Sequence, residues 1–307
     1  MSAEKDICCL WPEYYLQFPY FSEQTVRAEC YPRKFLHAKK SGKAIVLVHG
    51  LTDSPFYMLA IAQYFHENLG YDVYLPLLHS HGLKYPEGMA GVSLEHWKNN
   101  VRFALRTAAE GAERVSVGGF STGGALSYYF GCTDPLVTGD LYLFSAAFGI
   151  YGGGYRMFGG MPEFLLSMPV IRFLTNKQPL RDLVGVHPYR YDQVPLKSAG
   201  ELVRLISENN KLLKLPDMAA KRIFAAWSEY DRVIDVNRLR YISQLSVGDR
   251  FVSFVIPQDA RVSHASVVLK EHVYEINCRT GDAALEEANP HFAEMLAAVA
   301  RFESAAV

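Results

Sequence analysis

The stretch that most constrains the fold runs from Val115 to Ala125 and reads V-S-V-G-G-F-S-T-G-G-A. Apolar and small residues predict a buried strand at its start, and the residues from Gly124 to Gly131 are predicted to form a helix. Between them, Gly119 to Gly123 has the pattern G-x-S-x-G, which is typical of a sharp strand-to-helix turn that exposes one serine, Ser121. A glycine-rich turn with a capping serine would give the same letters, so this pattern alone does not fix the role of the serine.

The chain alternates between apolar runs typical of buried strands and segments with the apolar spacing of helices. Strands are predicted at 43–49, 71–77, 114–118, 140–147, 221–227 and 250–257, and helices at 56–69, 93–109, 124–131, 201–213, 236–245 and 290–304. This alternation predicts an α/β fold with a doubly wound, mostly parallel sheet and helices on both of its faces.

Two segments interrupt this rhythm and define the expected domain organisation. Residues 1–42 form an aromatic-rich N-terminal arm, expected to pack short strands on the body, and residues 148–197 form an inserted cap or lid. The core consists of residues 43–147 and 198–307. Methionine and aromatic side chains in the cap offer adaptable apolar surface for a lipid-like group, or else pack the cap onto the core.

Composition excludes several classes of partner. The chain has 307 residues, a formal net charge of −1 and no long run of one charge, so no nucleic-acid or anionic-membrane surface is indicated. We read no signal peptide and no membrane span. The five cysteines have irregular spacing, which predicts neither a disulfide framework nor a zinc site. We therefore expect a cytoplasmic protein, although a chain lacking its native leader would look the same.

A serine hydroxyl needs a neighbouring base, and that base needs an orienting acid, to act as a nucleophile. In this kind of sheet the three groups follow the carboxyl ends of strands in the order Ser, Asp or Glu, His. Asp231 follows the strand at 221–227, and His264 follows the last strand. Glu229 and Asp235 are the rival acids, but Glu229 is close to the strand end and Asp235 is predicted to cap the next helix.

An oxyanion formed at Ser121 would need two backbone N–H donors. Thr122, directly after the serine, and Leu51, in the loop after the strand at 43–49, are the expected donors. The pair His79 and His81 has no third ligand at a matching spacing, so we interpret its loop as structural and expect no metal site.

The motifs L-V-H-G-L-T-D-S, G-G-F-S-T-G-G, S-E-Y-D-R-V-I-D and V-S-H resemble those of the α/β-hydrolase superfamily, within its branch of bacterial carboxylesterases and monoacylglycerol lipases. The resemblance covers roughly residues 43–147 and 200–305. It implies a serine hydrolase without a cofactor, with Ser121 as nucleophile, Asp231 as orienting acid and His264 as base. Serine at the turn argues against the dehalogenase and epoxide hydrolase relatives, which use aspartate there.

The implied activity is cleavage of carboxylic esters with an apolar acyl group through an acyl-enzyme. The partner is then a small ester or lipid-like molecule, and the oligomeric state stays open. Two other readings remain: an acyltransferase or peptidase with the same triad, and a non-catalytic binding protein with this fold.

Overall fold

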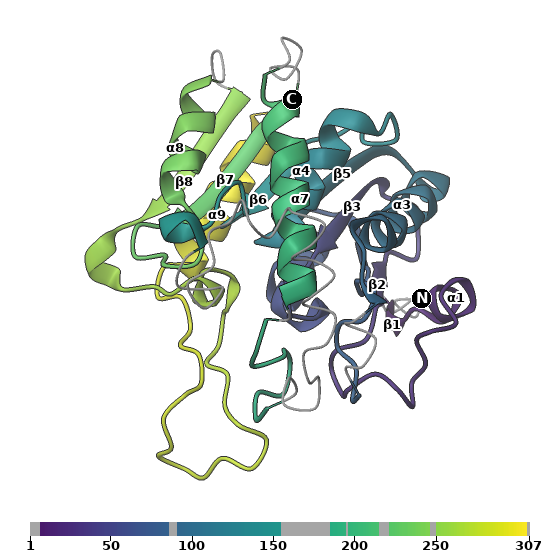
Figure 1. The fold of residues 1–307 in the computed structure, drawn as a ribbon. Coiled ribbons are helices and arrows are strands. Elements are labelled where there is room, and N and C mark those ends of the chain that lie inside the picture. Colours follow the sequence, from purple (N-terminus) through teal and green to yellow (C-terminus); the bar gives the residue numbers. More distant parts are fainter. Residues whose placement is uncertain are drawn as a thin grey trace.

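The computed structural model describes residues 7–85, 91–154, 185–194, 196–214, 221–245 and 250–305. Its centre is an eight-stranded sheet with the order β1-β2-β4-β3-β5-β6-β7-β8 (Figure 1). Strands β3 to β8 are parallel to one another, whereas at one edge β2 pairs antiparallel with β4 and β1 pairs antiparallel with β2. The strands are β1 (Ile7–Leu10), β2 (Arg33–Leu36), β3 (Gly42–Val48), β4 (Asp72–Leu75), β5 (Ala112–Phe120), β6 (Leu141–Phe144), β7 (Ile223–Ser228) and β8 (Phe251–Ile256).

Helices cover both faces of this sheet, because its central strands are apolar on both sides. In β3, Ala44, Val46 and Val48 point into a core shared with helices α3, α4 and α7, while Ile45 and Leu47 point into a second core shared with α2 and α9. The described helices are α1 (Pro12–Gln17), α2 (Leu59–Glu67), α3 (Leu94–Gly111), α4 (Thr122–Thr133), α7 (Leu196–Leu212), α8 (Val236–Leu245) and α9 (Phe292–Ser304). The predicted doubly wound α/β architecture is confirmed.

The N-terminal arm packs through its aromatic side chains, as expected, but it also extends the sheet. Trp11 and Tyr14 are fully buried, and both rings contact Phe103 of α3, at centroid distances of 5.6 and 5.8 Å. The Tyr14 hydroxyl donates a hydrogen bond to the carbonyl of Leu77 at 2.6 Å. The two short strands of the arm pair with each other and with β4, so they belong to the same sheet as the core.

The predicted helix at 201–213 begins earlier in the structure, since α7 starts at Leu196, inside the segment assigned to the cap. The predicted cap at 148–197 falls mostly on residues 155–184, which lie outside the described part of the chain. No helix in the described ranges has both the length and the hydropathy that crossing a membrane requires.

The backbone of α4 passes very close to the ends of β3 and β5. A Cβ atom added to Gly119 would lie 2.5 Å from the carbonyl oxygen of Val48 and 2.5 Å from the carbonyl carbon of Gly123. A Cβ at Gly123 would overlap the same Val48 oxygen even more severely. These neighbours are backbone atoms, which cannot turn aside as a side chain can, so both positions require glycine.

Replacing Gly123 with alanine is therefore expected to destabilise the fold by about 3 kcal/mol or more, because strand and helix must separate to admit one methyl group. Thermal or urea unfolding of the purified variant measures this loss. Gly91→Ala is the matched control, since nothing lies within 4 Å of a Cβ there, and we expect it to change stability by no more than about 0.5 kcal/mol. Equal stability of the two variants would contradict the packing argument.

Candidate active site

Ser121 lies in the turn between β5 and α4 with a φ angle of 54° and a ψ angle of −116°. A positive φ is unfavourable for serine, and such strain persists only where the surroundings hold the residue. Here the Ser121 N–H donates to the carbonyl of Phe144 and its carbonyl accepts from the N–H of Ala147, each at 3.0 Å. The turn therefore has the geometry that the G-x-S-x-G pattern predicted.

The predicted base and acid form a close pair at the ends of the last two strands. Nδ1 of His264 lies 2.6 Å from Oδ2 of Asp231, while Oδ1 of Asp231 accepts the N–H groups of Val233 at 2.8 Å and Ile234 at 3.1 Å. Burial raises the pKa of Asp231, but the attraction of His264 and these hydrogen bonds outweigh it, so the pKa lies below its usual value. The carboxylate is therefore ionised and fixed toward His264.

The two rival acids have other partners. Glu229 pairs with Arg240 and accepts a hydrogen bond from the indole N–H of Trp227. The carboxylate of Asp235 accepts the N–H of Asn237 at 3.1 Å in the first turn of α8. Of the three candidates, Asp231 is the one hydrogen-bonded to His264.

The loop after β3 contains Leu51, one of the two expected oxyanion donors; the other, Thr122, is the first residue of α4. His49 holds this loop, since its Nδ1 donates to the Gly50 carbonyl at 2.8 Å and its Nε2 accepts the N–H of Leu78 at 3.0 Å. Burial, reinforced by nearby His81, lowers the pKa of His49 well below its usual value, so this ring stays neutral. His49 thus holds the loop as a neutral ring.

Ser121 and His264 open into one cavity of about 190 Å³. Phe120, next to the serine, packs its ring against that of His264 at a centroid distance of 4.7 Å. Most of the remaining lining is apolar and comes from Leu51, Ala147, Ile150, Val194, Leu202, Val233, Ile234 and Ala265. This arrangement suits a substrate with an apolar group beside the reacting centre.

The described ends of the predicted cap flank this cavity. The N–H of Tyr151 donates to the carbonyl of Val233 at 3.0 Å, next to the Asp231 loop. From the other end, the N–H of Tyr191 donates to the carbonyl of Thr52 at 2.9 Å. Both ends of the insertion are therefore hydrogen-bonded to loops that carry site residues.

A group of ionisable residues beside the cavity was not predicted from the sequence. Asp53 and Arg190 both line it, and Arg190 is held by Glu286, with 2.6 Å between Nη1 and Oε1. The Tyr57 hydroxyl donates to the other oxygen of Glu286 at 2.7 Å, and His187 lies 3.6 Å from that oxygen. Burial raises the pKa of Glu286, but its hydrogen bonds and the charge of Arg190 bring it below the usual value.

Asp53 lies two residues after Leu51 and is buried against Gly50, where an added Cβ would overlap its carboxylate. Burial raises the pKa of Asp53 to about 7, although Arg190 opposes this shift. Its position in the loop after β3 was the sequence feature that could have identified it, since polar residues at the carboxyl ends of strands tend to face the site. No sequence feature identified Glu286, which lies at the end of a long loop that a bridge between Val273 and Glu286 closes (Figure 1).

No protein-family model matches the sequence, and no curated protein does. Solved structures do match. One is that of the metagenome-derived lipolytic enzymes LipS and LipT, with a TM-score of 0.65 and 19% identity over 91% of this chain and 99% of the other. A second is the monoacylglycerol lipase of Paleococcus ferrophilus, with a TM-score of 0.62 and 13% identity over 91% and 100% of the chains.

A third match is a soluble variant of the monoglyceride lipase of Saccharomyces cerevisiae, with a TM-score of 0.60 and 10% identity over 93% and 97% of the chains. The sheet order, the helices on both faces and these likenesses show that the chain has the α/β-hydrolase fold. The likeness extends over more of the chain than the core to which the sequence motifs pointed. At such low identity it defines the fold, and the chemistry must be argued from this chain's own residues.

Asp53 generates a prediction about stability and pH. The folded state holds a proton on this carboxyl up to about pH 7, whereas the usual value is 3.8. The folded state thus binds more protons, so wild-type stability should fall as the pH rises from about 4 to about 7. Asp53→Asn removes this loss. At pH 8 the free energy of unfolding of the variant should exceed that of the wild type by up to about 4 kcal/mol, with a higher unfolding temperature, and at pH 5 the difference should be far smaller.

Thermal unfolding at both pH values measures this difference. Asp259→Asn, which changes an exposed carboxyl, serves as the control. Its difference in stability from the wild type should be the same at pH 5 and pH 8. A gain from Asp53→Asn that is independent of pH would contradict the assignment.

Proposed function

We propose that this protein is a serine hydrolase that cleaves carboxylic esters through an acyl-enzyme intermediate. The observation that carries the proposal is the 2.6 Å pair of His264 Nδ1 and Asp231 Oδ2 behind a cavity that also contains Ser121 in its strained turn. A nucleophile, a base and an orienting acid are the minimal set for this chemistry.

The pairing determines what His264 can do. With Nδ1–H donating to Asp231, Nε2 carries the lone pair and is the nitrogen that can accept the serine proton. Ser121 Oγ then attacks the ester carbonyl as His264 takes that proton. When the tetrahedral intermediate collapses, the proton passes from His264 to the leaving alcohol, and water repeats the sequence to release the acid.

The negative oxygen of the tetrahedral intermediate needs two donors, for which we propose the backbone N–H groups of Leu51 and Thr122. Leu51 lines the cavity, and Thr122 begins α4, where the helix dipole favours negative charge. The hydrogen bond of His49 to Leu78 supports this role by holding the Leu51 loop. Side-chain replacements at Leu51 and Thr122 would leave these backbone donors in the chain.

The apolar lining supports an ester with an apolar acyl group, and the resemblance to lipolytic enzymes and monoacylglycerol lipases supports the same substrate class. We propose that the insertion at 148–197 acts as the lid of this cavity, since both of its described ends are hydrogen-bonded beside the site. Hydrolysis of p-nitrophenyl esters of increasing acyl length measures the preference.

Ser121→Ala is expected to remove ester hydrolysis, lowering kcat by about 10⁴-fold or more, because no other group takes the place of the nucleophile. The assay compares wild type and variant on the same p-nitrophenyl esters, and a covalent serine probe should label the wild type alone. Turnover that survives in Ser121→Ala would refute the nucleophile. Absence of both turnover and labelling in the wild type would favour a binding protein with this fold.

Asp231→Asn should lower kcat by about 10⁴-fold with a much smaller change in KM, because an amide no longer fixes the His264 tautomer. Glu229→Gln is the control, since Glu229 pairs with Arg240 instead, and it should stay within a few-fold of wild type. A larger loss from Glu229→Gln than from Asp231→Asn would exchange the roles of these acids. Product analysis with competing alcohols and amines separates hydrolysis from acyl transfer.

A further inference from the structure

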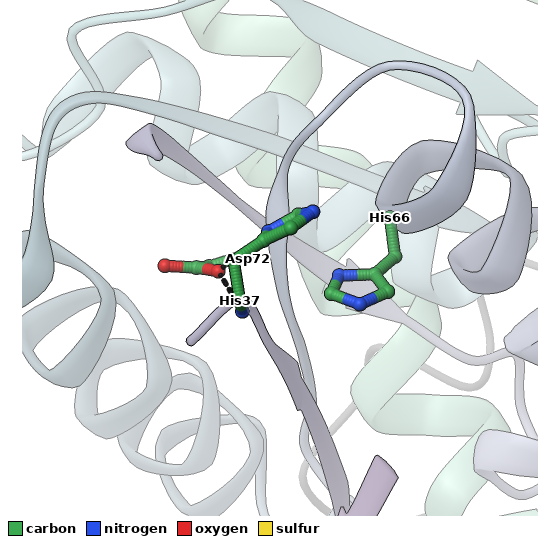
Figure 2. A group of neighbouring side chains, drawn as sticks. All are labelled: His37, His66 and Asp72. Atoms are coloured by element: carbon green, nitrogen blue, oxygen red, sulfur yellow. Dashed lines mark hydrogen bonds and ion pairs between the residues drawn. The ribbon is translucent and has the colours of Figure 1, made fainter. Parts of the chain in front are cut away.

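Three side chains of the kinds that bind transition metals lie close together, as Figure 2 shows. They are His37, directly after β2; His66, in the last turn of α2; and Asp72, the first residue of β4. One ligand atom from each lies within 4.8 Å of the others. Asp72 begins β4, whereas Ser121 follows the end of the parallel strand β5, so this cluster and Ser121 lie at opposite ends of the strands.

The fold itself brings the three residues together. The antiparallel pairing of Phe35 with Val73 places the residues after β2 beside the start of β4. The turn between α2 and β4 includes Gly70 at a φ of 68°, and it returns the chain so that the Tyr71 N–H donates to the Phe65 carbonyl at 3.0 Å. The cluster thus joins the N-terminal arm, a covering helix and a core strand.

The distances are close to those of a coordination sphere. Zinc binds imidazole nitrogen and carboxylate oxygen at about 2.0–2.2 Å, so neighbouring ligand atoms in a tetrahedral site lie roughly 3.4 Å apart. Nδ1 of His37 and Oδ1 of Asp72 lie 3.0 Å apart. Because the three ligand atoms lie within 4.8 Å of one another, they need to close by at most about 1.4 Å to reach this spacing, which small rotations of the side chains can supply.

Two further contacts orient the ligands as metal sites require. Nδ1 of His66 lies 3.1 Å from the Tyr71 carbonyl, so it is the nitrogen that carries the proton, and Nε2 has the lone pair. Oδ1 of Asp72 accepts the backbone N–H of His37 at 2.8 Å, which holds the carboxylate toward both rings. The side chain of His37 is 24% exposed, which gives an ion a route from solvent.

Charge favours a cation at this point. Asp72 is only 6% exposed, and among the described residues the group within ion-pair distance of it is His37. A divalent cation beside a buried carboxylate compensates its charge. Two imidazoles in three ligands select zinc or a similar transition metal over Mg²⁺ and Ca²⁺, which prefer oxygen.

We propose that His37, His66 and Asp72 bind one divalent transition-metal ion, with Zn²⁺ as the best-matched ion and water completing its coordination. The ion cross-links β2, α2 and β4 and stabilises the edge of the sheet where the N-terminal arm joins. The site is structural, and its occupancy is independent of the proposed esterase reaction. The competing account is a simple His37–Asp72 ion pair, with the His66 ring tilted against the His37 ring at a centroid distance of 4.0 Å.

Calorimetric titration of the full chain with ZnCl₂, after treatment with EDTA and dialysis, tests the proposal. We expect one equivalent of Zn²⁺ to bind to the wild type, and free Zn²⁺ at 100 times its Kd should shift the unfolding equilibrium about 100-fold toward the folded state. Co²⁺ in its place should give the visible absorption of a four-coordinate ion with nitrogen and oxygen ligands.

His37→Ala changes a partly exposed side chain, so it should fold, and we expect it to weaken Zn²⁺ binding at least about 10-fold. His66→Gln should do the same. The matched control is His291→Ala, because His291 also lies 2.9 Å from a carboxylate, that of Glu294, but is not part of the cluster. His291→Ala should bind Zn²⁺ like the wild type.

Absence of Zn²⁺ binding by the wild type would overturn the proposal and favour the simple ion pair. Equal affinity of wild type and His37→Ala would overturn it as well, because the ion would then bind elsewhere, for example at a free cysteine. A stabilisation by Zn²⁺ that survives unchanged in both His37→Ala and His66→Gln would have the same meaning. None of these outcomes bears on Ser121, so the proposed esterase activity stands or falls separately.

Discussion

The contact on which the rest of the structure depends is the passage of α4 across the ends of β3 and β5, where glycine backbone meets glycine backbone. This closeness puts Ser121 directly after the carboxyl end of β5, with its φ angle in the positive range. It also places the start of α4 against the carbonyls of Val48 and His49, at the start of the loop that carries Leu51 and Asp53. The serine, the loop beside it and the cavity in front of it therefore share one packing constraint.

Much of the fold and of the site could be predicted from the sequence. The apolar periodicity of each segment and the alternation of strands and helices along the chain can be read from neighbouring residues. The helix Val236–Leu245 has the predicted bounds, and Asp231 and His264 follow the strands that were expected to carry them. Their catalytic roles remain predictions. The parallel sheet brings them together, because the carboxyl ends of its strands lie side by side although they come from distant parts of the chain.

The parts that could not be predicted depend on contacts between distant segments that have no period. Asp53, Arg190 and Glu286 meet beside the cavity from three separate loops, and no spacing in the sequence relates them. The same reason explains why the cluster of His37, His66 and Asp72 was not predicted. Ligand motifs have a fixed spacing within one segment, whereas these three residues belong to three separate segments. The early start of α7 shows a different limit, since its first residues follow an insertion without a clear boundary signal.

The order of the strands has a consequence for how the chain is made. Ser121 is in place once β3, β5, α4 and β6 have formed, but Asp231 and His264 follow β7 and β8 and lie more than 100 residues beyond Ser121 in the sequence. A growing chain that leaves the ribosome from its N-terminus thus carries a serine without a base until the final strands join the sheet. If the proposed chemistry holds, the protein stays inert toward esters throughout its synthesis, and its reactivity begins with the last step of folding.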